Sequence, residues 1–94
     1  MNLPKNVLSE ITRFSEIYKV KRVKLFGSRA RGTNRERSDV DILAFGDDID
    51  GFRNALEEEA ETLLKFDVLD AKSTFSEELK SEIERDGVVI YEKI

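Results

Sequence analysis

The sequence contains no cysteine and no histidine among its 94 residues. Without cysteine, neither a disulfide framework nor a thiolate metal site can form. Without histidine, serine–histidine catalysis, histidine-ligated zinc and a histidine general base are all excluded. Any chemistry must therefore use carboxylates, hydroxyls, lysine, arginine, backbone groups and bound ions.

Long hydrophobic runs are missing as well. No segment approaches the roughly 20 apolar residues of a membrane span, and the charged N-terminus has no signal-peptide core. We therefore expect a cytoplasmic protein that does not interact with membranes. Hydrophobic residues make up 39% of the chain and charged residues 38%, which is typical of a globular protein. The length fits one domain, residues 1–94.

Acidic residues outnumber basic ones by 20 to 16, so the formal net charge is −4. This balance argues against nucleic acid as the main partner. The positive charges are nevertheless concentrated within residues 21–37, whereas the chain after residue 47 is mostly acidic. A local site for an anion is therefore compatible with the overall negative charge.

Short hydrophobic segments between glycine and polar residues predict four strands. We expect them at residues 20–26, 39–45, 65–71 and 88–91. Residues 27–37 are rich in glycine, arginine and small polar residues, which predicts a loop with one helical turn. The alternation of strands with helices favours an α/β (α+β) fold in which helices flank a small mixed sheet.

Helical spacing predicts about three helices. The first carries Val7, Ile11, Phe14 and Tyr18 on one face, with Pro4 in its first turn.

The second helix is expected at residues 52–64, with Phe52, Leu56, Ala60 and Leu63 on its buried face. A third begins at a capping box of Thr74 and Glu77. It buries Leu79 and Ile83 and ends at Gly87.

Two aspartates stand two positions apart where the second strand is expected to begin. Side chains at such positions point to the same face of a strand, so Asp39 and Asp41 project together, roughly 7 Å apart along the backbone. Their like charges repel unless a cation lies between them. Mg²⁺ or Mn²⁺ suits such an oxygen site and also binds phosphate oxygens.

The preceding strand runs into Gly27 and Ser28. Glycine allows the backbone to approach a ligand closely, and the serine offers N–H and O–H donors to phosphate oxygens. Arginines such as Arg29 and Arg31 follow directly and supply countercharge. An anion site and a carboxylate pair at the ends of consecutive strands together predict binding of a triphosphate with its metal.

A third carboxylate is needed if two metal ions are to be held. The expected strand at 65–71 offers Asp67 and Asp70, which point to opposite faces. Asp67 is flanked by apolar residues in the strand interior. We therefore select Asp67.

These residues carry a resemblance to a known family. Gly27-Ser28, followed by Ala30, Gly32 and the run from Ser38 to Asp41, resembles the signature of the DNA polymerase β-like nucleotidyltransferases. Among these, the chain is most similar to the minimal nucleotidyltransferase (MNT) family of bacteria and archaea. Its C-terminal segment, 87–91, also resembles the ends of those short proteins.

The resemblance implies transfer of a nucleoside monophosphate, such as AMP from ATP, onto a hydroxyl with release of pyrophosphate. It implies that Asp39, Asp41 and Asp67 are the catalytic residues and hold two Mg²⁺ ions, with Mn²⁺ as an alternative. Nucleotide binding falls to four residues of the motif, namely Gly27, Ser28, Arg29 and Ser38.

Members of this family commonly work beside a small helical HEPN-type protein, as the antitoxin of a toxin–antitoxin pair. The resemblance therefore implies that the acceptor hydroxyl belongs to such a partner.

Two other functions stay open from the sequence. The first is a binding module that neutralises a partner by masking it, and the second is a transferase that modifies an antibiotic or RNA. The three aspartates disfavour the masking module, because a pure binder has no need for converging carboxylates. The nucleobase, the acceptor and formation of a homo-oligomer are left open.

Overall fold

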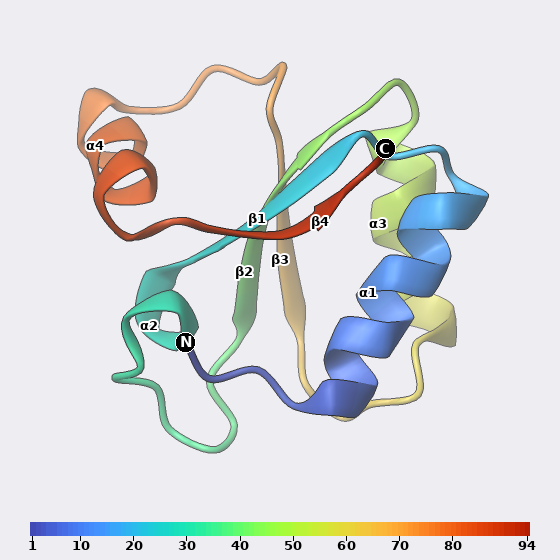
Figure 1. The fold of residues 1–94 in the computed structure, drawn as a ribbon, viewed down its shortest axis with the longest axis horizontal. Coiled ribbons are helices and arrows are strands. Elements are labelled where there is room, and N and C mark those ends of the chain that lie inside the picture. The colour runs from blue at the N-terminus through green and yellow to red at the C-terminus, as the bar shows by residue number, and fades with distance from the viewer.

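A four-stranded sheet lies between two pairs of helices in the computed structural model, which describes residues 1–94 (Figure 1). The elements in chain order are α1 (Lys5–Ile17), β1 (Arg22–Phe26), α2 (Gly27–Arg31), β2 (Val40–Phe45), α3 (Ile49–Glu59), β3 (Phe66–Asp70), α4 (Glu77–Asp86) and β4 (Val88–Glu92). None of the helices combines the length and hydrophobicity of a membrane span.

The sheet is mixed, with strand order β3-β2-β1-β4. β1 pairs antiparallel with both β2 and β4, whereas β2 and β3 are parallel and are connected through α3. The predicted mixed sheet with flanking helices is therefore confirmed. The helical turn expected after β1 is present as the five-residue α2, which brings the number of helices to four.

The two faces of the sheet are covered unequally. On one face, α1 and α3 lie side by side (Figure 1) and bury the main core, which contains Ile11, Phe52 and Ile42. On the other face, α4 covers only a small cluster of three buried residues, Phe26, Leu43 and Ile83. Side chains of β1, β2 and β3 on this second face are therefore partly open to solvent.

Helix α3 starts and ends earlier than residues 52–64. Asp48 caps it at the N-terminus, where the carboxylate accepts a hydrogen bond from the Gly51 N–H at 3.0 Å. Ala60 is the C-cap, so the chain leaves the helix before Leu63. The prediction that Leu63 is buried on this helix is wrong, because its side chain is fully exposed in the following loop.

Helix α4 starts later than predicted, and the capping box of Thr74 and Glu77 does not form. Ser76 is the N-cap instead, and its hydroxyl accepts a hydrogen bond from the Leu79 N–H at 3.1 Å. The end of the helix at Gly87 and the burial of Ile83 agree with the sequence analysis. Pro4, which was expected in the first turn of α1, is instead the N-cap, and the helix begins at Lys5.

The revised cap of α4 can be tested by comparing two alanine variants. Ser76→Ala should lower the free energy of unfolding by about 1 kcal/mol, because it leaves a helix N–H without a partner. Thr74→Ala should have almost no effect, since Thr74 is exposed and outside the helix. Urea denaturation measures both, and a larger loss for Thr74→Ala would contradict the revised cap.

Candidate active site

Asp41 and Asp67 lie side by side at one end of the sheet. Each is the second residue of its strand, and the parallel register of β2 and β3 pairs them directly. Adjacent strands are about 4.8 Å apart. Asp41 shares a face of β2 with Leu43, which packs under α4. The structure thus brings together two aspartates from separate strands on the less covered face.

The other acidic candidates have different positions. Asp39 precedes β2, which begins at Val40, so it is exposed and lies outside the strand expected to contain it. Asp70 pairs with Ala44 on the opposite side of β3 from Asp67. Its carboxylate accepts a hydrogen bond from the Lys72 N–H at 2.9 Å and closes a turn. Asp70 therefore belongs to the strand end, away from the other carboxylates.

The surroundings of Asp41 disfavour the charged form of its carboxyl group. Its pKa rises to about 6, first because the carboxyl is partly buried, and then because Asp67, Asp39 and Glu82 are negative. Arg31 lowers the pKa of Asp41, but the other effects outweigh it. None of the three aspartates forms an ion pair. The negative charge of this end of the sheet is therefore not neutralised within the protein.

This donor set fits a divalent cation by its chemistry. Carboxylate oxygens are the ligands that Mg²⁺ and Mn²⁺ prefer, and uncompensated negative charge favours their binding. The side chains are not gathered around one point, because no group of three acidic residues is close enough to coordinate a single ion as it stands. Asp39, Asp41 and Asp67 would have to converge on the metal when it binds.

Gly27 makes close packing against Asp41 possible. Its φ angle is +73°, in the left-handed region that glycine adopts without strain. A Cβ atom at this position would overlap the Asp41 carboxylate. The turn after β1 can therefore pass directly beside the Asp41 side chain only because residue 27 has no side chain.

The two serines of the motif differ in their surroundings. Ser28 is half-buried in the first turn of α2, directly after Gly27. Ser38 belongs to the loop that leads into Asp39, where its hydroxyl accepts a hydrogen bond from the Arg35 N–H at 2.8 Å. Ser28 thus follows the glycine that packs against Asp41, whereas Ser38 belongs to the loop that leads into Asp39.

The structure corrects the role expected of Arg29. Only 2% of its surface is exposed. Its guanidinium donates to the carbonyl oxygens of Glu36 at 2.9 Å, Ser38 at 3.0 Å and Asn2 at 3.2 Å. These bonds turn the guanidinium towards the loop and the N-terminus and occupy it with backbone carbonyls. Arg29 instead fixes the loop before Asp39.

Two charged residues near Asp41 were missed or left undecided by the sequence analysis. Glu82 of α4 acts on the pKa of Asp41, as does Arg31 at the end of α2. Glu82 lies 41 positions after Asp41 in the chain, so no local pattern links them. Arg31 stands four residues after Gly27, a spacing that returns a helical side chain to the same side.

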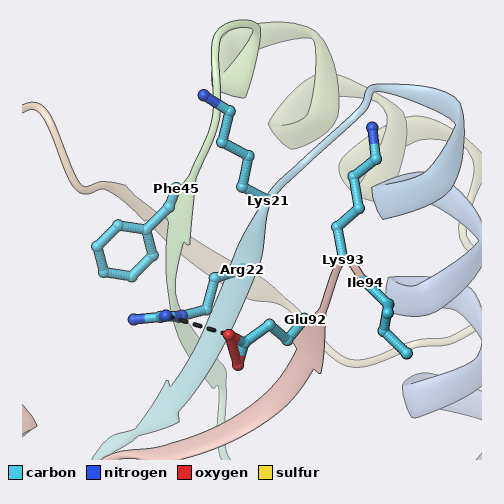
Figure 2. A pocket seen from close by; sticks show the side chains of 6 residues that line it. All are labelled: Lys21, Arg22, Phe45, Glu92, Lys93 and Ile94. Carbon is cyan, nitrogen blue, oxygen red and sulfur yellow. Dashed lines mark hydrogen bonds and ion pairs between the residues drawn. The ribbon is translucent and has the colours of Figure 1, made fainter.

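The largest hollow on the protein lies away from this site. It measures about 540 Å³ and is at the end of the sheet where β1 starts and β2 ends (Figure 2). Arg22 and Glu92 form an ion pair at 3.1 Å there, and the Arg22 guanidinium lies over the ring of Phe45. Because this hollow contains none of the paired aspartates, we assign the chemistry to the end of the sheet that carries Asp39, Asp41 and Asp67, which we call the acidic end.

Comparison with known families and relatives agrees with an enzyme that uses such a site. The model of the family described as polymerase beta, nucleotidyltransferase matches residues 9–94. A protein of Methanocaldococcus jannaschii is 39% identical over 79 residues, which cover 78% of this chain and 79% of that protein. Its name, given provisionally, is protein adenylyltransferase.

Solved structures share the fold. A toxin–antitoxin crystal structure with AMP-PNP has a TM-score of 0.69 and 22% identity, covering 92% of this chain and 73% of that one. A mutant of the toxin–antitoxin MntA–HpeT has a TM-score of 0.68 and 20% identity over the same shares. A Shewanella oneidensis protein has a TM-score of 0.63 and 17% identity, covering 97% and 74%. At these identities the likeness establishes the fold.

The contact between Gly27 and Asp41 can be separated from backbone strain by using Gly32 as a control. Gly32 also has a positive φ, +78°, but no atom lies within 4 Å of a Cβ built there. Gly32→Ala should therefore lower the free energy of unfolding by about 1 kcal/mol, from strain alone. Gly27→Ala should lower it by about 3 kcal/mol, because it adds a collision. Equal losses in urea denaturation would contradict the contact.

The raised pKa of Asp41 predicts a pH-dependent stability in the absence of metal. The folded protein holds this proton to a higher pH than the unfolded chain, so stability falls as pH rises from about 4 to about 6. At pH 8, Asp41→Asn should be more stable than wild type by about 1 kcal/mol, a value reduced for solvent screening. Near pH 4 the difference should disappear.

Urea denaturation in EDTA at both pH values makes this measurement, with Asp70→Asn as the control on the opposite face. A stabilisation by Asp41→Asn that is the same at pH 4 and pH 8 would show that the carboxylate charge is not its cause.

Proposed function

This chain belongs to the polymerase β nucleotidyltransferase family, and we propose that it transfers AMP from ATP onto a hydroxyl of a partner protein. It is a nucleotidyltransferase by its family. The observation that carries the proposal is the pair Asp41 and Asp67, whose charges are uncompensated and lie beside the Gly27 turn. Such a site suits a triphosphate that arrives with a divalent cation.

The relatives support the identity of the nucleotide and the acceptor. The Methanocaldococcus jannaschii relative is named for adenylyl transfer to protein, and a structure with the same fold contains AMP-PNP. Two structural neighbours are toxin–antitoxin assemblies. We therefore propose that this chain is the antitoxin of such a pair, and that its partner is a small helical protein of the HEPN type.

In the proposed reaction, the acceptor oxygen attacks the α-phosphorus and the bond to the β-phosphate breaks. Pyrophosphate leaves, and the acceptor proton passes to Asp67, which is exposed and so within reach of a partner's side chain. Asp39, Asp41 and Asp67 would hold the divalent cations, two Mg²⁺ or two Mn²⁺. When bound, these cations neutralise phosphate charge and lower the pKa of the attacking hydroxyl.

The remaining motif residues position the nucleotide. Gly27 allows the triphosphate and Asp41 to approach the same stretch of backbone, and the Ser28 N–H and O–H groups donate to its outer phosphates. Arg29 and Ser38 act indirectly, because their hydrogen bonds hold the loop before Asp39. Positioning and charge neutralisation supply most of the catalysis in such a transfer.

The masking module remains the second candidate, and the exposed Leu63 is the observation that favours it. This leucine is fully exposed on the loop before β3, where a partner could contact it whether or not a reaction occurs. The two candidates therefore differ in what the aspartates do, since a masking protein does not require them.

Aspartate variants separate the two candidates. The chain is co-expressed with the protein encoded by the neighbouring gene, and the intact mass of that partner is measured. With the wild-type chain, the mass of the partner should increase by that of one or more AMP groups. Asp67→Asn and the double variant Asp39→Asn with Asp41→Asn should each reduce transfer by about 100-fold or more, because the cations are lost. Asp70→Asn, on the other face of β3, should retain activity.

Growth of the co-expressing cells supplies the second readout. On the enzyme proposal, the double variant still binds the partner but no longer protects cells. If the double variant protects fully and the partner mass never changes, the chain is a masking module and the proposed reaction is wrong.

A further inference from the structure

The largest hollow on the protein carries positive charge, in contrast to the acidic end of the same sheet. Its lining includes the cations Lys21, Arg22 and Lys93 and the ring of Phe45, and we call it the basic hollow (Figure 2). The charge of Arg22 is balanced by Glu92 at 3.1 Å. Lys21 and Lys93 are exposed and form no ion pair, so the basic hollow keeps two positive charges.

The two unpaired lysines lie next to each other where β1 begins and β4 ends. The Lys93 N–H donates to the Lys21 carbonyl oxygen at 2.9 Å, one position beyond the pairing of Arg22 with Glu92. Figure 2 shows both lysine side chains extending in the same direction from this end of the sheet. Like charges directly opposite each other on neighbouring strands are destabilising. The lysine pair therefore opposes the stability of the isolated chain and favours an anionic ligand.

The basic hollow lies along β2 from the proposed transfer site. Phe45 follows Asp41 by four positions on β2, so both side chains point to the same face of the sheet. They are about 13 Å apart along the strand. A standard protein interface covers about 800 Å² on each partner, so one bound protein can contact both ends of this face.

We propose that the basic hollow binds an acidic segment of the partner protein while the acceptor hydroxyl of that partner reaches Asp67. This inference rests on the proposed function. Carboxylates of the segment bind the ammonium groups of Lys21 and Lys93, and an apolar side chain next to them contacts Phe45. Because the acidic end repels such a segment and the basic hollow attracts it, the charges also orient the partner as it approaches.

A protein segment suits the basic hollow better than a nucleic acid does. Single-stranded nucleic acids stack their bases on aromatic side chains. The ring of Phe45 already carries the Arg22 guanidinium, which lies 5.6 Å from the ring centroid. A long polyanion would also extend from the hollow over the rest of a chain whose net charge is −4. A short acidic segment fits within the positive region.

Reversal of one lysine charge tests the docking site. The probe is the protein encoded by the neighbouring gene, and its binding is measured by surface plasmon resonance without nucleotide, so that no transfer occurs. Lys21→Glu can pair with Lys93 across the strands, so the sheet should stay folded. It should nevertheless weaken binding of the partner by about 10-fold or more, largely through slower association. Added salt should weaken binding by wild type more than binding by the variant.

Lys5→Glu is the matched control, because Lys5 is also exposed, forms no ion pair and does not line the basic hollow. An acidic residue is favourable at this position, the first of α1. The control should leave the affinity for the partner within about 2-fold of wild type. Circular dichroism confirms that both variants are folded.

Transfer kinetics give a second readout. With ATP and Mg²⁺, Lys21→Glu should raise the KM for the partner and leave kcat within about 2-fold of wild type, because docking binds the partner equally before and during the reaction. A fall in kcat with an unchanged KM would contradict a docking role.

The docking site and the proposed function fail in different ways. Equal binding of the partner by Lys21→Glu and wild type would overturn the docking site and leave the transfer reaction intact. Binding that depends on Lys21, with no increase in partner mass when ATP and Mg²⁺ are present, would overturn the transfer and leave the docking site. Tighter binding of a single-stranded oligouridylate than of the partner, lost in Lys21→Glu, would overturn the inference. Wild type that does not bind the partner would overturn both.

Discussion

The close approach of Gly27 to the Asp41 carboxylate is the contact on which the acidic end depends. Strand β1 ends at Phe26, and the chain must turn at once into α2 beside the side chain that leaves β2. The left-handed φ of residue 27 favours glycine, and a Cβ there would force the Asp41 carboxylate to move. The same turn starts α2, which begins with Gly27 and Ser28 and ends at Arg31, so one backbone position sets where this helix lies relative to Asp41.

The acidic end opposes the stability of the fold. Partial burial is the first cause of the raised pKa of Asp41, and the negative charges of Asp67, Asp39 and Glu82 raise it further. None of Asp39, Asp41 and Asp67 forms an ion pair that would relieve this. A structural role alone would favour neutral or paired residues in these positions. Perturbed carboxylates in an open position are instead typical of sites that meet a charged ligand. The main core under α1 and α3 compensates for this local cost.

Sequence patterns predicted the features that depend on residues close together in the chain. Alternation along β3 separates Asp67 from Asp70, and the parallel pairing of β2 and β3 then places Asp67 beside Asp41. The patterns did not predict features that depend on contacts between segments far apart in the chain. Arg29 is buried because the carbonyl of Asn2, 27 positions away, reaches its guanidinium. Glu82 lies near Asp41 because α4 packs across the sheet, and no spacing in the sequence expresses that contact.

Charge also explains why nucleotide and metal have to arrive together on the proposed function. A triphosphate alone would be repelled by four nearby carboxylates, and Arg31 supplies only one positive charge against them. Divalent cations that travel with the phosphates would reverse this balance, because their positive charge would offset that of both the phosphates and the carboxylates. On the proposed function, the aspartates at this end of the sheet would therefore select for metal-bound nucleotide before any acceptor hydroxyl approaches.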